Sequence, residues 1–229
     1  MSTLWIIGTI VASYLVGSIP FGLIFGFLIK GVDIRQHGSR NIGATNAARV
    51  IGFKWFPVVL LLDALKGAGP CLAAVFLSPT GLDLALFAAM GALLGHFYSC
   101  YIGFKGGKGV ATGLGVVMIL TLPPDSWVPV PALLALGVFA VVLAVTRMVS
   151  VSSVLAALSI PALYYAWIGQ PALQEPLMWR LLFLTFVSLF VVVKHRANLK
   201  RVMRGEEPRL GRNRQLPATE DTENRQATG

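Results

Sequence analysis

The sequence predicts an all-α polytopic integral membrane protein with about seven transmembrane helices. Of its 229 residues, 55% are hydrophobic and only 13% are charged, whereas about 25% are charged in an ordinary soluble domain. The chain also holds 24 glycines, a residue that is more frequent in membrane helices than in soluble ones. This composition excludes a soluble globule, a disordered chain, collagen and a coiled coil.

Each span is expected as a long apolar stretch, because a helix needs about 20 residues to cross a hydrocarbon core about 30 Å thick. Seven stretches are candidates, and the fourth of them is short and glycine-rich. In chain order they are Leu4–Ile29, Trp55–Leu77, Leu84–Ile102, Val110–Leu122, Val128–Thr146, Val151–Ile168 and Leu177–Val193.

The distribution of basic residues predicts the orientation, because Lys and Arg gather in short cytoplasmic loops. They occur in the first, third and fifth loops and in the tail, as Lys30, Arg35, Arg40, Arg49, Lys54, Lys105, Lys108, Arg147 and the residues from Lys194 onward. Asp83, Asp125 and Glu175 mark the opposite side, and Arg180 and Lys66 depart from the pattern. We therefore expect the amino terminus outside and the carboxyl terminus in the cytoplasm.

Two segments are expected: a transmembrane domain over residues 1–211 and a disordered polar cytoplasmic tail over residues 212–229, which lacks apolar periodicity. The net charge of +9 is assigned to the membrane surface and not to nucleic acid. Cys71 and Cys100 have no His or acidic residue at metal-ligand spacing, so no metal and no cofactor is expected.

The first basic loop is rich in small hydrogen-bonding side chains and glycine. It reads Gly38-Ser39-Arg40-Asn41-Ile42-Gly43-Ala44-Thr45-Asn46-Ala47-Ala48-Arg49. Glycines let backbone N–H groups face a ligand, so the loop is suited to an oxyanion. The alternative is an ordinary capped turn in which Ser39 and Asn41 satisfy backbone groups.

The third loop places two lysines among glycines where a helix is expected to begin, in the segment Gly103-Phe104-Lys105-Gly106-Gly107-Lys108-Gly109. A helix N-terminus with a nearby lysine favours phosphate binding. The spacing does not match the nucleotide-binding P-loop, because Gly109 follows Lys108 where that motif has Ser or Thr. The alternative is that the lysines only follow the positive-inside rule.

Two further groups of polar residues lie at helical spacing. Asp63 and Lys66 are three residues apart inside the second predicted span, where a structural ion pair and a site-lining role are both possible. His195, Asn198 and Arg201 follow the last span at intervals of three and would share one helix face at the cytoplasmic boundary. A basic helix there is also typical of an anionic-lipid contact.

Together these segments resemble the bacterial membrane glycerol-3-phosphate acyltransferase family that uses acyl phosphate as donor. The resemblance extends to about Gly211 and rests on Gly17–Gly22, Asp33–Arg35, Gly38–Ser39, Asn41–Arg49, Leu62–Gly67, Gly95–His96, Phe104–Thr112 and His195–Glu207. The chain departs from the family where Arg40 replaces a usual glycine and where Tyr98-Ser99 replaces a usual Phe-Pro pair.

The resemblance implies transfer of a fatty acyl group from acyl phosphate to the 1-hydroxyl of sn-glycerol 3-phosphate, which gives lysophosphatidic acid and phosphate. We expect Ser39, Arg49, Lys105 and Lys108, with Gly106 and Gly107, to bind the substrate phosphate. Asn41, Thr45, Asn46, His195 and Asn198 would orient the acyl phosphate and stabilise the developing charge. Weaker candidates are Lys66, Arg147, Ser150, Ser153 and Glu207. The proton acceptor is either a phosphate oxygen of the donor or His195.

The expected location is the bacterial inner membrane with the site facing the cytoplasm, and the expected partners are the two substrates, the lipid bilayer and a soluble enzyme that forms acyl phosphate. The competing interpretation is a transporter for small organic phosphates, since basic glycine-rich loops would suit that role as well. A carrier would place its site near the midplane of the membrane, whereas these motifs collect on one side.

Overall fold

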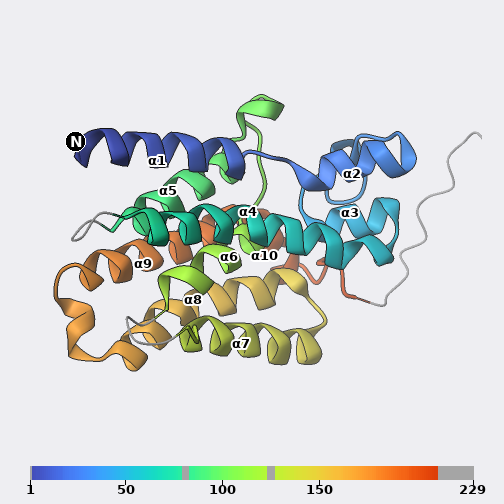
Figure 1. Ribbon diagram of the computed structural model, residues 1–229. Helices are drawn as coiled ribbons and strands as arrows, with labels where there is room; N and C mark the ends of the chain where they lie inside the picture. Colours follow the sequence, from blue (N-terminus) through green and yellow to red (C-terminus); the bar gives the residue numbers. More distant parts are fainter. Residues whose placement is uncertain (1, 79–82, 123–126, 211–229) are drawn as a thin grey trace, which may run out of the picture.

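The computed structural model describes residues 2–78, 83–122 and 127–210, which form a bundle of helices with no strand in these ranges (Figure 1). The helices are α1 (Ser2–Gly17), α2 (Phe21–Lys30), α3 (Ala44–Ile51), α4 (Phe56–Leu77), α5 (Leu84–Phe97), α6 (Val110–Leu120), α7 (Val130–Thr146), α8 (Val149–Ile168), α9 (Leu177–Lys194) and α10 (Arg196–Met203). The predicted tail at 212–229 lies outside the described residues.

Five stretches are long and apolar enough to cross a membrane: Thr3–Lys30, Phe53–Leu77, Leu84–Ile102, Val149–Ile168 and Leu177–Lys194. They coincide with five of the seven predicted spans. The other two predicted spans are the apolar helices α6 and α7, which have 11 and 17 residues. At 1.5 Å per residue, α6 is about 16 Å long, roughly half of the hydrocarbon thickness.

The first predicted span is interrupted between α1 and α2. Pro20 has no N–H and cannot continue the hydrogen-bond ladder of α1, so the chain leaves the helix after Gly17 and starts α2 at Phe21. At the break the carbonyl of Ile19 accepts a short-range hydrogen bond from the amide of Phe21 at 3.2 Å, and the ammonium of Lys66 also donates to it at 2.6 Å. Lys66 also pairs with Asp63 at 2.8 Å, and both side chains are buried. Lys66 therefore compensates the broken helix.

Helix packing depends on close backbone approach at glycine. α1 packs along α5, and α4 packs against α5 and α6. A Cβ atom at Gly17 would collide with the backbone of Ala92, and one at Gly67 would collide with the carbonyl of Thr112. The remaining long helices form a second layer, in which α7 packs on α8 and α8 on α9.

The two ends of the bundle are formed by different elements (Figure 1). The amino terminus of α1 lies at one end, and α2, α3 and α10 lie towards the other. At the amino-terminal end, Arg180 pairs with Asp83 at 2.6 Å and donates to the carbonyl of Leu120 at 3.4 Å. This ion pair joins α9 to the start of α5 and accounts for the departure of Arg180 from the positive-inside pattern.

The Lys66–Asp63 pair gives the first testable prediction. We expect Lys66→Met to lower the free energy of unfolding by about 3–5 kcal/mol, because it leaves a buried carboxylate without its counter-charge. Thermal unfolding in detergent measures the effect. The double variant Asp63→Leu/Lys66→Met removes both charges and should recover part of the loss; a double variant less stable than Lys66→Met would contradict the ion-pair explanation.

Candidate functional site

Asn198, a predicted site residue of the last helix, contacts the carboxylate of Glu207. This buried carboxylate accepts hydrogen bonds from Ser150 Oγ at 2.6 Å and Asn198 Nδ2 at 2.7 Å, and it forms an ion pair with Arg201 at 2.9 Å. The side-chain oxygen of Asn198 in turn accepts a hydrogen bond from the ammonium of Lys108. The network therefore connects the N-termini of α6 and α8 to α10.

Local backbone geometry brings Glu207 back onto its own helix. Asn198 and Arg201 are three residues apart in α10 and share one face, as the spacing predicts. The chain then reverses at Gly205, which has a φ of +70°, a conformation that favours glycine. Beyond Glu207 the segment continues to the α7–α8 connection, where the amide of Leu210 donates to the carbonyl of Arg147 at 2.8 Å.

His195 lies buried at the corner between α9 and α10. Its Nδ1 is 2.8 Å from the carbonyl oxygen of Val191. A carbonyl can only accept, so Nδ1 carries the proton and Nε2 keeps a free lone pair. Burial and the nearby charge of Lys108 lower the pKa of His195, and together they outweigh the hydrogen bond to Val191 and the charge of Glu207, which raise it. The ring is therefore neutral near pH 7 and can accept a hydrogen bond at Nε2.

The cluster around Lys108 carries excess positive charge. Burial lowers the pKa of Lys108 to about 8, and the charges of Arg201 and Arg49 contribute to the decrease. Burial alone would raise the pKa of Glu207, but hydrogen bonds from Ser150 and Asn198 and the charge of Arg201 outweigh it, so this pKa lies below its usual value. Three cations against one carboxylate leave two net positive charges, which suits a phosphate ligand.

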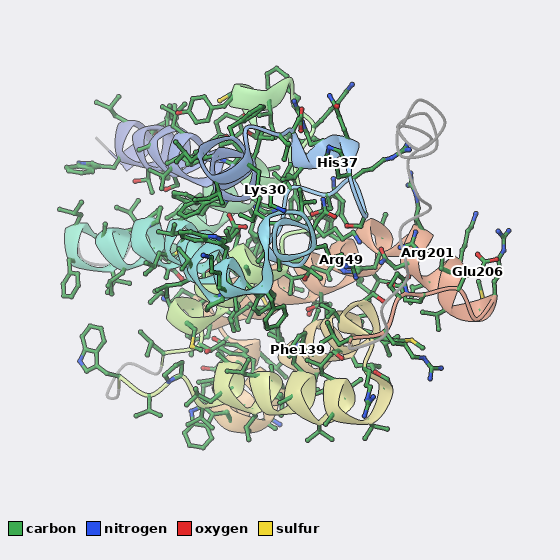
Figure 2. All side chains as sticks on the ribbon, turned by 90° about the vertical axis from the view of Figure 1, so that its right-hand side faces the viewer. Lys30, His37, Arg49, Phe139, Arg201 and Glu206 are labelled. Atoms are coloured by element: carbon green, nitrogen blue, oxygen red, sulfur yellow. The ribbon has the colours of Figure 1, made fainter. Side chains whose placement is uncertain are left out.

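Figure 2 views the molecule from the end that carries these residues, and Arg49 and Arg201 are both labelled on that end. Arg49 comes from α3, the helix that follows the first basic loop. Its charge acts on Lys108 together with that of Arg201. The first loop, the glycine-rich loop and α10 therefore contribute cations to one region.

The glycine-rich loop is fixed by its own backbone. The amides of Gly106 and Gly107 donate to the carbonyls of Phe97 and His96 at 3.2 and 3.0 Å. A Cβ atom at Gly106 would collide with the His96 carbonyl, and one at Gly109 with the ring of Phe97. We expected Gly106 and Gly107 to bind the substrate phosphate. Their amides instead donate to backbone carbonyls and hold the loop against the end of α5.

The asparagines of the first loop also serve the loop itself. Asn46 is buried; its amide donates to the carbonyls of Ile34 at 2.8 Å and His37 at 3.1 Å, and its oxygen accepts from the amide of Ser39 at 2.7 Å. Asn41 accepts from the amide of Gly43 at 2.9 Å. The bond of Asn41 to the backbone matches the capped-turn interpretation. Ser39, the other residue of that interpretation, is exposed.

The remaining candidates are placed as follows. Thr45 is half-buried on α3, and Lys105 is exposed in the glycine-rich loop. Ser153 donates to the carbonyl of Val149 within α8 at 2.7 Å. Arg147 is exposed and ends α7 with a φ of +56°. Of the weaker candidates, Ser150 and Glu207 therefore belong to the hydrogen-bond network around the Glu207 carboxylate. Lys66 instead donates to the carbonyl of Ile19 at the α1–α2 break.

Both departures from the family pattern have a structural reading. Arg40 has a φ of +57°, where a side chain costs about 1–2 kcal/mol relative to glycine. Ser99 is buried with a φ of −64°, which proline also adopts, and its hydroxyl donates to the carbonyl of Ser18 at 2.6 Å. The Ser99 hydroxyl thus connects the residues that follow α5 to the α1–α2 break.

One buried hydrogen bond next to the glycine-rich loop was not predicted from the sequence. His96 Nδ1 and Thr112 Oγ1 are hydrogen-bonded at 3.0 Å between α5 and α6, and both residues are buried. The sequence does place these two polar residues at the ends of apolar stretches. Because buried polar groups need a hydrogen-bond partner, this placement could have indicated that they pair with each other.

The Glu207 network predicts a pH dependence of stability. Because the folded pKa of Glu207 is lowered, its contribution is complete above the unfolded pKa of about 4.3 and is lost as pH falls through the lower folded value. We expect Glu207→Gln to cost about 1.5–3 kcal/mol at pH 7 and to weaken the loss of stability in acid. Thermal unfolding from pH 3 to 7 measures both effects.

Glu206→Gln is the matched control, because Glu206 is the exposed neighbour. It should leave stability and its acid dependence unchanged. Equal effects of the two substitutions would contradict the role of Glu207 as the acceptor that joins α8 and α10.

Comparison with known proteins identifies the chain's family. The family model for glycerol-3-phosphate acyltransferase matches residues 7–205. Glycerol-3-phosphate acyltransferases from Acholeplasma laidlawii and Desulfotalea psychrophila are 38% and 44% identical; the alignments cover 92% and 85% of this chain and 95% and 93% of the relatives. A solved integral membrane glycerol 3-phosphate acyltransferase in its glycerol 3-phosphate form aligns with a TM-score of 0.78 and 36% identity, over 90% of this chain and 96% of that one. The chain therefore belongs to the glycerol-3-phosphate acyltransferase family.

Proposed function

We propose that this protein transfers a fatty acyl group from acyl phosphate to the 1-hydroxyl of sn-glycerol 3-phosphate. The products are lysophosphatidic acid and inorganic phosphate. The observation that carries the proposal is the cationic Lys108–Asn198–Glu207 network beside a neutral His195 at one end of an apolar helical bundle, in a chain of this family. Both substrates bring phosphate groups to that end, and the acyl chain of one belongs in the bilayer.

The proposed topology has seven spans, with the amino terminus outside and the carboxyl terminus in the cytoplasm of a bacterial cell. α6 and α7 complete the seven, since both are apolar helices between longer candidate spans. The basic loops that follow α2, α5 and α9 carry Lys and Arg towards one end, as cytoplasmic loops do. The site would then face the cytoplasm from the inner membrane, where a soluble enzyme that forms acyl phosphate supplies the donor.

Phosphate binding is assigned to Arg49, Lys105, Lys108 and Ser39. Arg49 can make a bidentate contact with a phosphate, whereas a lysine contributes a point charge. Lys108 already donates to Asn198, so an arriving phosphate would share or replace that contact. Gly106 and Gly107 contribute by holding the loop that presents the two lysines, because their amides are bonded to α5.

In the proposed reaction the hydroxyl oxygen of glycerol 3-phosphate attacks the carbonyl carbon of the donor. A C–O bond forms, the bond from the carbonyl carbon to the phosphate oxygen breaks, and phosphate leaves with the hydroxyl proton. The lone pair on His195 Nε2 can accept a hydrogen bond from the hydroxyl and orient it. Asn198, Asn41, Thr45 and Asn46 are proposed to orient the acyl phosphate and to stabilise the developing charge. Asn41 and Asn46 also hold the first loop in shape.

The proton acceptor distinguishes two versions of this mechanism. In the first, a phosphate oxygen of the donor takes the proton, and no side chain acts as base. In the second, His195 takes it at Nε2 and later releases it. The lowered pKa of His195 favours the uncharged ring, which can act in either version. We take the first version as the proposal, because it needs no side chain as base, and the second as its alternative.

The test of function uses purified protein in detergent with palmitoyl phosphate and labelled glycerol 3-phosphate. We expect a labelled lysolipid and stoichiometric phosphate. A protein that forms no lysolipid but carries glycerol 3-phosphate into vesicles would contradict the proposal and favour a transporter of organic phosphates.

His195 variants test the proton acceptor. We expect His195→Gln and His195→Ala to lower kcat by about 10²-fold, the size of a lost hydrogen-bonding group in the transition state, while residual turnover stays measurable. Steady-state kinetics and binding of each substrate give the two quantities. Complete loss of turnover with intact binding of both substrates would instead identify His195 as the base.

The lowered pKa of Lys108 predicts an alkaline limit. Because its ammonium loses a proton above about pH 8, we expect kcat/KM for glycerol 3-phosphate to fall as pH rises through 8. Lys108→Arg should remove this fall, since a guanidinium stays charged, whereas Lys105→Arg should retain it. An unchanged alkaline limit in Lys108→Arg would contradict the assignment.

A further inference from the structure

The ammonium of Lys194, the last residue of α9, lies over the faces of three aromatic rings. Its Nζ is 4.6 Å from the ring centroid of Tyr98, 5.3 Å from that of Phe97 and 5.4 Å from that of Phe190. All three distances are within the range of about 6 Å for a cation–π contact. No carboxylate lies within ion-pair distance of Lys194 in the described part of the chain.

These rings connect the last helix to the end of α5. Phe97 is buried in the helix that leads into the glycine-rich loop, and its ring packs edge-on against Phe190 of α9 with centroids 4.7 Å apart. Tyr98 is the next residue, and Tyr14 of α1 donates to its carbonyl at 2.7 Å. Lys194 therefore connects α9 to the end of α5 in the first helical layer.

Phe97 also sets the position of the loop that carries Lys108. Its carbonyl accepts from the amide of Gly106 at 3.2 Å. Its ring occupies the space that a Cβ atom at Gly109 would need. One buried residue thus contacts the glycine-rich loop on one side and the ammonium of Lys194 on the other.

We propose that Lys194 is a positioning residue for the acyl transfer. Its contacts with the Phe97 and Tyr98 rings hold the α9–α10 corner in a fixed position relative to the glycine-rich loop. His195 and Asn198 are thereby kept at a fixed distance from Lys108. The inference rests on the proposed function and adds a residue that touches neither substrate. A displacement of about 1 Å between reacting groups can reduce turnover by about 10²-fold, so a modest loosening of this contact would be visible in kcat.

The alternative is that Lys194 has no positioning role and is one more basic residue at the membrane surface. Lys200, on α10, distinguishes the two roles because it is an exposed lysine near the same corner. Met preserves the length and apolar stem of lysine but has no charge, whereas Arg preserves the cation and stacks on rings. The test therefore compares Lys194→Met, Lys194→Arg and Lys200→Met in the full-length protein.

The kinetic test measures kcat and KM for glycerol 3-phosphate with palmitoyl phosphate as donor. We expect Lys194→Met to lower kcat about tenfold with KM changed less than about twofold, and Lys194→Arg to restore most of it. Lys200→Met should match the unsubstituted protein. Equal losses in Lys194→Met and Lys200→Met, or no rescue by arginine, would overturn the proposal.

Hydrogen–deuterium exchange tests the coupling independently of activity. Lys194→Met should speed exchange of the amides of Gly106 and Gly107 as well as those of the α9–α10 corner, and Lys200→Met should leave both unchanged. Unaltered exchange at the glycines in Lys194→Met would overturn the proposal. If the unsubstituted protein has no acyltransferase activity, only the proposed function is refuted. The exchange measurement would still show whether Lys194 holds the glycine-rich loop in place.

Discussion

Charges inside this apolar bundle lie where another part of the chain supplies a compensating group. In a medium of low dielectric constant an isolated charge is too costly to keep. Lys66 pairs with Asp63 and donates to the carbonyl of Ile19, and Arg180 pairs with Asp83. The Lys66–Asp63 pair lies within α4, but the bond of Lys66 to Ile19 and the Arg180–Asp83 pair connect different elements. These two contacts therefore also fix how the helices pack against one another.

The same constraint explains the character of the candidate site. Glu207 compensates only part of the charge of Lys108, Arg49 and Arg201, so the cluster is stable enough to form yet still attracts an anion. His195 contributes no positive charge, because burial keeps its ring neutral and Val191 fixes its tautomer. The candidate site therefore combines a net positive charge with one hydrogen-bond acceptor, the combination on which the proposed function rests.

Sequence patterns predicted the features that depend on composition and helical spacing. The positions of five spans, and the shared face of Asn198 and Arg201, follow from apolar stretches and from intervals of three residues. The Pro20 break was missed because hydropathy continues unchanged across it, although proline was visible in the sequence. The bonding of the Gly106 and Gly107 amides could not be predicted, because their acceptors on Phe97 and His96 are set by tertiary contact. The same is true of Ser150, whose partner Glu207 is 57 residues away.

The two layers of the bundle are tied at both ends. Lys108 and Asn198 join α6 to α10 at one end, and Asp83 and Arg180 join α5 to α9 at the other. An alternating-access carrier has to open one end while closing the other, which would require each tie to break in turn. The paired ties instead favour a static scaffold, in which the two layers keep one arrangement at both ends of the bundle.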